Sequence, residues 1–191
     1  MTRANRVKLR VIQGGQYFEI PHGSYRIVAA PEEKSPFDVD AVVYEEDTYL
    51  VLSADPKVRE PKDHPVKIMT RLIEATPETP GSVLVRGKHP RRHPLRFLAI
   101  IHDFNQEPTW REEWIASALN GIFQEAETRK LTSVALPMLG CLHGSLDRQR
   151  FFALLRSAIT QSTQRRLKRI WLITPPGTSY KSLKVLTSEF N

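Results

Sequence analysis

The pattern of apolar and polar positions gives the two halves of the chain different characters. In the second half, short apolar runs alternate with stretches in which apolar residues recur at steps of three and four. The runs at 96–104, 133–138 and 169–174 are typical of strands buried on both faces. The stretches at 115–126 and 145–159 each have one apolar face and predict amphipathic helices. This alternation predicts an α/β fold built of βα units, with a largely parallel sheet covered by helices on both faces.

The first half predicts shorter elements joined by proline-containing loops. Many of the 14 prolines lie between residues 56 and 94. Two apolar segments flank the sequence PHGS, a pattern that favours a β-hairpin. The predicted elements are strands at 7–12, 17–20, 25–30, 39–44, 49–53 and 82–87, a short helix at 66–75, and a final helix with Leu183, Leu186 and Phe190 facing inward.

The segment that follows the strand at 133–138 is the strongest candidate site. Ligands of open parallel sheets bind beyond the carboxyl ends of the strands. Gly140 and Gly144 would let the backbone approach a ligand, and the helix that Ser145 is expected to cap would present unpaired N–H groups to an anion. The turn therefore predicts an anion site, although an ordinary strand-to-helix turn explains the same residues equally well by composition.

Four segments resemble the macrodomain family in order and spacing. The segment LTSVALPMLGCLHGSLD (131–147) resembles the strand and phosphate loop that read Pro-Ala-Leu-Gly-Thr-Gly, an apolar residue, then Gly. DVDAVV (38–43), RFLAIIHDF (96–104) and RIWLITPPGTSYKSLKVL (169–186) resemble the family's other strands. The resemblance covers roughly residues 37–190 and implies a three-layer α/β/α domain with a mixed, largely parallel sheet. Residues 1–36 are then expected to form an N-terminal β extension packed on a domain at 37–191.

The resemblance also implies a function. Macrodomains typically bind ADP-ribose and related nucleotides, and some remove ADP-ribose from proteins. Here Tyr44, Glu45, Glu46 and Asp47 stand where the family has Asn-Ala-Ala-Asn, the following loop contains no glycine, and Leu142 replaces a loop glycine. We therefore expect a binding module for a nucleotide or an ADP-ribose-related ligand, without hydrolase activity, cofactor or metal. The expected ligand-binding residues are Tyr44, Asp103, Phe104, Leu139, Gly140, Cys141, Leu142, His143, Gly144 and Ser145.

The charge distribution leaves two alternatives open. The net charge of +7 favours polyanionic partners, and two basic segments supply much of it. One alternative is an association with RNA or DNA, and the other is an interaction domain that kept the fold and lost the ligand. The candidate nucleic-acid contacts are Arg86, Lys88, Arg91, Arg92, Arg165, Arg166, Lys168 and Arg169. Neither segment has the interleaved aromatic residues of a single-strand-binding groove, so both are also explained as solvated surface.

Catalytic chemistry finds less support in the sequence. The single cysteine, Cys141, excludes a disulfide within the chain and a cysteine-based zinc site. A Cys141–His143 nucleophile would need a thiolate whose pKa is lowered at a helix N-terminus, whereas a buried, inert thiol is the favoured interpretation. We interpret the acidic residues at 45–47 as a solvated turn, with acid–base chemistry as the alternative. Because no apolar run is long enough for a signal peptide or a membrane span, a soluble cytoplasmic protein is expected.

Overall fold

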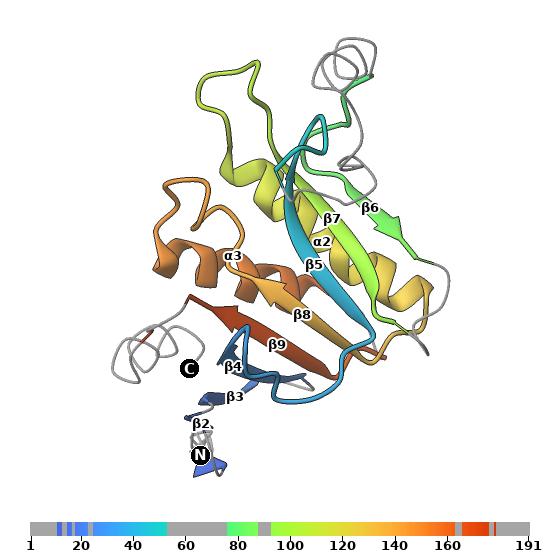
Figure 1. Ribbon diagram of the computed structural model, residues 1–191, viewed down its shortest axis with the longest axis vertical. Helices are drawn as coiled ribbons and strands as arrows, with labels where there is room; N and C mark the ends of the chain where they lie inside the picture. Colours follow the sequence, from blue (N-terminus) through green and yellow to red (C-terminus); the bar gives the residue numbers. More distant parts are fainter. Residues whose placement is uncertain are drawn as a thin grey trace, which may run out of the picture.

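A seven-stranded mixed sheet organises the structure, a computed structural model that describes residues 11–12, 15–16, 18–22, 25–52, 76–87, 93–162, 166–175 and 178. The strand order is β3-β4-β9-β8-β5-β7-β6 (Figure 1). The strands of this sheet are β3 (Phe18–His22), β4 (Tyr25–Pro31), β5 (Ala41–Asp47), β6 (Val83–Arg86), β7 (Leu95–His102), β8 (Ser133–Pro137) and β9 (Arg169–Thr174). Two further strands, β1 (Val11–Ile12) and β2 (Gly15–Gln16), pair with each other.

The interior of the sheet is parallel and both its edges are antiparallel. Strands β4, β9, β8, β5 and β7 run in the same direction, while β3 and β6 pair antiparallel with β4 and β7. The expected mixed, largely parallel sheet is therefore confirmed. The hairpin expected around PHGS is formed by β3 and β4, and β4 pairs in parallel with β9 inside the main sheet.

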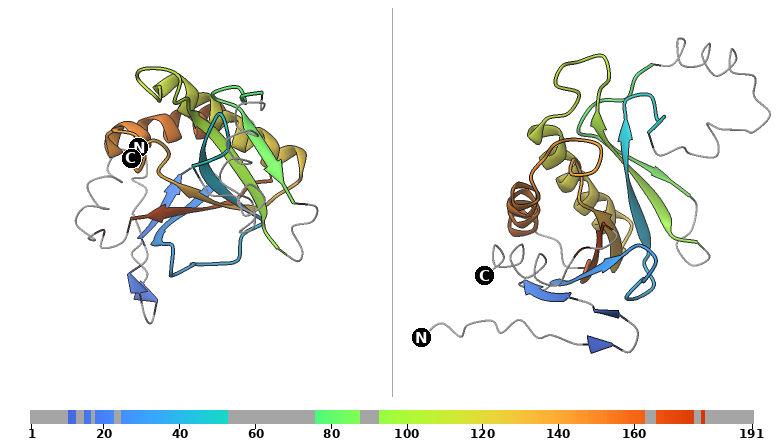
Figure 2. Two further views of the ribbon diagram at one scale, coloured as in Figure 1. Left: turned by 45° about the horizontal axis from the view of Figure 1, so that its top comes forward. Right: turned by 60° about the vertical axis from the view of Figure 1, so that its left-hand side comes forward.

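Two helices, α2 (Glu112–Thr128) and α3 (Arg148–Gln161), lie side by side on one face of the sheet (Figures 1 and 2). The apolar stripe predicted for α2 is buried as expected; its members are Ile115, Ala118, Leu119, Ile122, Phe123 and Ala126. Helix α3 buries Phe151, Phe152, Leu155, Ala158 and Ile159. Neither of these two helices is long and apolar enough to cross a membrane.

The opposite face of the sheet carries a smaller apolar cluster. Ala30, Ala135 and Trp171 form its buried part, and Phe37 packs against it. The indole N–H of Trp171 donates a hydrogen bond to the backbone oxygen of Ala30 (3.0 Å). The helices predicted at 66–75 and at the C-terminal end lie outside the described residues.

Two local predictions are wrong, for one physical reason. The strand expected at 49–53 is instead a turn over 48–52, because the Asp47 carboxylate accepts hydrogen bonds from the N–H groups of Tyr49, Val51 and Leu52 at 2.7–2.8 Å. The N-cap of α3 is Asp147, not Ser145; its side chain accepts from the N–H groups that open the helix. In both places an aspartate side chain competes for backbone donors and decides the local structure.

Asp40 fastens the start of β5 to the start of β8. Its carboxylate accepts hydrogen bonds from the N–H and hydroxyl of Thr132 and from the N–H of Ser133, at 2.7–3.1 Å. Burial by itself raises the pKa of Asp40, but the hydrogen bonds from Thr132 and Ser133 together outweigh it and hold the pKa below its ordinary value. The folded state therefore prefers the ionised carboxylate.

We expect Asp40→Asn to lower the free energy of unfolding by about 1 kcal/mol at pH 7, a value discounted for solvent screening. Because the folded pKa is depressed, this advantage of the wild type is complete above the unfolded pKa of about 3.9 and is lost as the pH falls through the folded pKa. Urea unfolding at pH 7 and near pH 3 measures the difference. Asp38→Asn, an exposed neighbour, is the matched control; an equal effect of both substitutions would contradict this role of Asp40.

Candidate functional site

A cavity of about 390 Å³ opens at the carboxyl ends of the parallel strands. It forms where β5 and β8 separate. These two strands pair only at Ala41–Val134 and Val42–Ala135, whereas β5 stays paired with β7 as far as Asp47. Figure 1 shows β5 and β8 spreading apart toward their carboxyl ends. The volume falls in the range of ordinary small-molecule sites.

The cavity wall is mostly apolar and carries a few polar groups. Its residues come from β5, from the carboxyl ends of β8 and β9, from the segments that follow β4, β5, β8 and β9, and from the first residue of α3. The apolar members are Val42, Val43, Leu52, Pro137, Met138, Leu142, Ile173 and Pro175; the others are Glu32, Tyr44, Glu45, Cys141, His143, Arg148 and Thr174. Apolar walls with a few directional polar groups are typical of ligand sites.

The structure brings together only some of the site residues expected from the sequence. Tyr44, Cys141, Leu142 and His143 line the cavity. Leu139 and Gly140 are buried behind its wall. The remaining four, Asp103, Phe104, Gly144 and Ser145, do not line it.

Asp103 and Phe104 serve the loop after β7. The carboxylate of Asp103 accepts hydrogen bonds from the N–H of Asn105 (3.0 Å) and the side-chain amide of Gln106 (2.6 Å). Phe104 is 56% exposed, and its ring stacks near that of His102.

The two glycines of the turn are required by packing. Gly140 has a φ of +76°, in the region that favours glycine, and a Cβ built on it would lie 2.5 Å from Cδ1 of Ile115. A Cβ on Gly144 would lie 2.6 Å from the backbone oxygen of Gly140. The close approach that these glycines permit is therefore to α2 and to the turn itself.

The backbone N–H groups of this turn divide into used and unused donors. Those of Cys141 and Leu146 donate to the oxygens of Met138 and Gly140. Within the described part of the chain, no group accepts from the N–H of Leu142, His143 or Gly144. The unused donors of the turn are therefore consecutive.

The expectation that α3 presents free N–H groups to the turn is wrong. The Asp147 carboxylate accepts from the N–H groups of Gln149 (2.8 Å) and Arg150 (3.4 Å). This carboxylate also offsets the positive end of the helix dipole. The N–H groups of Gln149 and Arg150 are therefore not available to an anion, and the backbone donors for such a site would come from the turn.

Glu45 and His102 form a buried pair at the edge of the cavity. Nε2 of His102 lies 2.6 Å from Oε1 of Glu45, and the N–H of Gly140 donates to Oε2 (3.0 Å). The side chains of His102 and Glu45 are 1% and 7% exposed. One carboxylate thus joins β5, β7 and the turn after β8.

The acidic segment at the end of β5 is not a solvated turn, so this expectation is wrong. Glu45, Glu46 and Asp47 are all buried. Asp47 accepts the three backbone hydrogen bonds described above, and Oε2 of Glu46 accepts from the N–H of Asp47 (3.3 Å). Buried carboxylates require such donors, and here the backbone supplies most of them.

Cys141 is not an activated nucleophile. Burial, followed by the neighbouring charge of Glu45, raises the pKa of its thiol to about 12. The thiol therefore stays protonated near neutral pH, in contrast to the lowered pKa that a helix N-terminus would give. Among the described residues, no group of three or more His, Cys, Asp or Glu side chains could hold a metal ion.

Sequence reasoning missed two charged residues of the cavity, Glu32 and Arg148. Glu32 directly follows β4, and Arg148 is the first residue of α3. The sequence contained a signal for Arg148, because this residue lies shortly after the glycine turn that was the candidate anion site. Glu32 joins the site only because β4 pairs in parallel with β9, a long-range contact that local patterns do not reveal.

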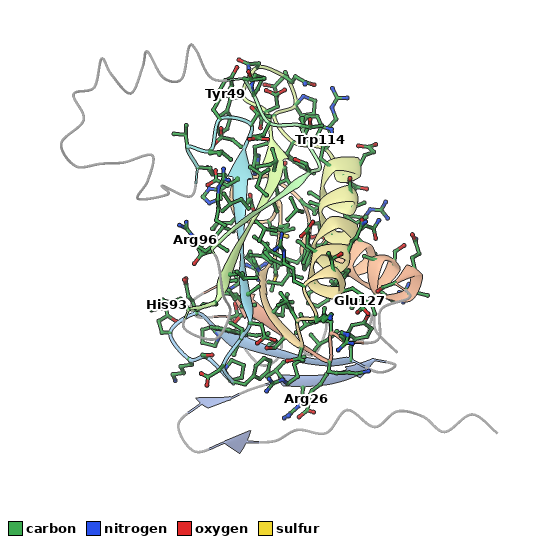
Figure 3. All side chains as sticks on the ribbon, turned by 90° about the vertical axis from the view of Figure 1, so that its right-hand side faces the viewer. Arg26, Tyr49, His93, Arg96, Trp114 and Glu127 are labelled. Atoms are coloured by element: carbon green, nitrogen blue, oxygen red, sulfur yellow. The ribbon has the colours of Figure 1, made fainter. Side chains whose placement is uncertain are left out.

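The described members of the candidate nucleic-acid set lie at the opposite end of the sheet from the cavity, and one of them, the exposed Arg166, lies three residues before β9. Arg86 ends β6 beside the start of β7, while Lys168 and Arg169 mark the start of β9. Figure 3 shows Arg26 and His93, which belong to this end, far from Tyr49 at the carboxyl end of β5. Arg86 and Arg169 lie four strands apart in the sheet, roughly 19 Å at the usual strand spacing. Lys88, Arg91, Arg92 and Arg165 lie outside the described residues.

Comparison with solved structures identifies the architecture. The Oceanobacillus iheyensis macrodomain with ADP superimposes with a TM-score of 0.62 at 12% identity, over 91% of this chain and 94% of that one. The macrodomain of Thermus aquaticus DarG gives 0.56 at 17% identity, over 78% and 98%. The chain has the macrodomain fold. Thermosipho africanus DarTG in complex with ADP-ribose gives 0.58 at 16% identity over 90% of this chain, which spans about half of that longer protein (47%).

Comparison of the sequence alone with known families and proteins gives no such match. No family model matches the chain, and no curated protein matches it. The resemblance noted in the sequence aligns Asp47 with the last position of the family's Asn-Ala-Ala-Asn segment. Its carboxylate holds the following turn, so this position has a structural task here.

We expect Cys141 to react slowly with Ellman's reagent in the folded protein. A thiol with a pKa of about 12 holds far less thiolate at pH 8 than an unfolded cysteine, so the rate should be at least about a hundredfold lower than in denaturant. The chain has one cysteine, so the signal is unambiguous. His143→Ala should leave the slow rate unchanged; equal rates in the folded and unfolded protein would reject the protonated thiol.

We expect Gly140→Ala to destabilise the fold by about 2–4 kcal/mol, from the positive φ together with the contact with Ile115. Ile115→Val removes the Cδ1 atom in that contact. In the Ile115→Val background, Gly140→Ala should therefore cost only about 1–2 kcal/mol. Denaturant unfolding of the four proteins in this cycle measures the coupling, and equal costs in both backgrounds would exclude Ile115 as the cause.

Proposed function

We propose that the chain binds a nucleotide or an ADP-ribose-related phosphorylated ligand in the cavity between β5 and β8, without hydrolysing it. The observation that carries this proposal is the cavity itself. It lies at the carboxyl ends of the parallel strands, where open α/β sheets bind their ligands. Its volume and its apolar wall suit a nucleoside-sized molecule.

The charged and donor groups at one side of the cavity favour a phosphate. Arg148 lines the cavity, and its guanidinium can hold phosphate oxygens through charge-assisted hydrogen bonds. The N–H groups of Leu142, His143 and Gly144 add consecutive donors on the bordering turn. Consecutive backbone donors of this kind form anion-binding concavities.

The other polar groups of the cavity favour the remainder of such a ligand. The Glu32 carboxylate can accept a hydrogen bond from a base amino group. The Thr174 hydroxyl can donate to and accept from a sugar. The apolar side chains of Val42, Met138 and Ile173 offer contact surface for flat rings.

The absence of hydrolysis is proposed from the state of the candidate catalytic groups. The Cys141 thiol is protonated, and the carboxylates of Glu45 and Asp47 already accept hydrogen bonds from the protein itself. A general base must reach the proton that it removes with a free acceptor. The wall of the cavity therefore favours binding over turnover.

A second candidate function is an association with nucleic acid. One observation favours it: the described basic residues Arg86, Lys168 and Arg169 share the end of the sheet at which the parallel strands begin. Binding there would weaken steeply with salt, because phosphate contacts release counterions. This end of the sheet is remote from the cavity, so variants can separate the two functions.

The test is calorimetric titration with ADP-ribose, AMP and a short RNA at moderate salt. We expect Arg148→Gln to weaken nucleotide binding about 10- to 100-fold, the effect of losing a hydrogen bond to a charged group. Arg166→Gln removes the same charge at the opposite end of the sheet and should leave nucleotide affinity unchanged. Absence of heat with both nucleotides, for a protein shown to be folded, would reject the nucleotide proposal. Salt-sensitive RNA binding lost in Arg166→Gln would favour the second candidate.

A further inference from the structure

We propose that Glu45 determines specificity by acting as a built-in anion, so that the cavity selects a ligand with one phosphate over a ligand with a diphosphate. This inference rests on the proposed nucleotide binding and narrows its ligand to the nucleoside monophosphate class. Glu45 stands in the cavity wall, whereas its two donor partners, Gly140 and His102, do not line the cavity. Glu45 therefore borders the cavity, and its two hydrogen-bond partners do not.

The carboxylate uses the donors that an additional phosphate would need. Oε1 lies 2.6 Å from Nε2 of His102, and Oε2 accepts from the N–H of Gly140 at 3.0 Å. Both oxygens are thus engaged, and the donors point at the protein's own acid. Carboxylate and phosphate oxygens seek the same partners, because each is a strong acceptor that favours backbone N–H groups and cationic donors.

The distribution of donors around the cavity then limits the number of phosphates. Arg148 is the single Lys or Arg in the described lining, and the unused N–H groups run from Leu142 to Gly144. Together they can satisfy one phosphate. Beyond that group, a second phosphate would meet the acceptor surface of Glu45 and would find the N–H of Gly140 occupied.

The position of the pair formed by Glu45 and His102 also suits a role in ligand recognition. Burying a carboxylate is costly unless donors replace its hydration, and here the residue that carries this carboxylate also borders the cavity. Here the group is buried from bulk solvent, with a side-chain exposure of 7%, and still forms part of the wall. This position lets it discriminate between ligands that enter the cavity.

The experiment compares AMP, ADP and ADP-ribose by calorimetry in the wild type, Glu45→Ala and Glu45→Gln. In the wild type, AMP should bind at least as tightly as ADP and ADP-ribose. Glu45→Ala frees both donors, and the ratio of ADP affinity to AMP affinity should rise about tenfold or more. Glu45→Gln is the matched variant: it removes the charge, but its amide oxygen can still accept from the N–H of Gly140, so the ratio should rise less than in Glu45→Ala.

A thermal-shift measurement with formate keeps the inference testable if Glu45→Ala is too unstable to titrate. Formate should raise the Tm of Glu45→Ala more than the Tm of the wild type, because the variant has two further vacant donors, the N–H of Gly140 and Nε2 of His102; equal shifts in both proteins would overturn the inference. Glu45→Ser, whose side chain is too short to reach both donors, should behave like Glu45→Ala.

The outcomes separate this inference from the proposed function. Nucleotide binding with the same ADP-to-AMP ratio in the wild type and Glu45→Ala would overturn the role of Glu45 alone. Tighter binding of ADP than of AMP by the wild type would overturn it as well. Failure of every protein to bind any of the three nucleotides would reject the proposed function, and this specificity with it.

Discussion

The geometry of this site depends on the hydrogen bonds that connect the Glu45 carboxylate to two other segments of the chain. This carboxylate is held by His102 from β7 and by Gly140 from the turn after β8, so three separate segments meet at one side chain. Removing a carboxylate from water costs several kcal/mol unless donors replace its hydration. The N–H of Gly140 is one of those donors, and the positive φ of Gly140 favours a residue without a Cβ. The conformation of the turn and the wall of the cavity are therefore connected through this carboxylate.

Strand β5, which carries Glu45, is anchored at both of its ends by aspartate side chains. Asp40 ties the start of β5 to β8, and Asp47 holds the turn that follows β5. Between these anchors, β5 leaves β8 and continues along β7, which opens the cavity. Of these two acids, Asp40 lies in the segment that resembles the family and Asp47 in the segment that departs from it, and both maintain the fold at this edge.

The fold of this protein does not by itself determine its function. A macrodomain fold is compatible with several activities, since function depends on the groups within a site and not on the architecture around it. Among the residues that the structure describes, the cavity of this chain is lined by one arginine, Arg148, and by two carboxylates, of which Glu45 is engaged with the protein's own groups.

Local patterns in the sequence determined the periodic elements. The continuous apolar runs identified β7, β8 and β9, and the spacing of Ile115, Leu119 and Ile122 identified the buried face of α2. These features depend on the side chains of neighbouring residues, so they can be recognised without the rest of the chain. The glycine turn at 140–144 was found for the same reason, and so was the resemblance to the macrodomain family.

Tertiary structure alone decided the state of the polar groups. Glu45, which the sequence presented as part of a solvated acidic turn, is buried because donors 57 and 95 residues away reach it. Cys141 is inert because burial and Glu45 raise its pKa. Glu32 enters the cavity through the pairing of β4 with β9. Hydrogen-bond partners and electrostatic environment are set by contacts between distant segments, and the order of residues along the chain does not contain those contacts explicitly.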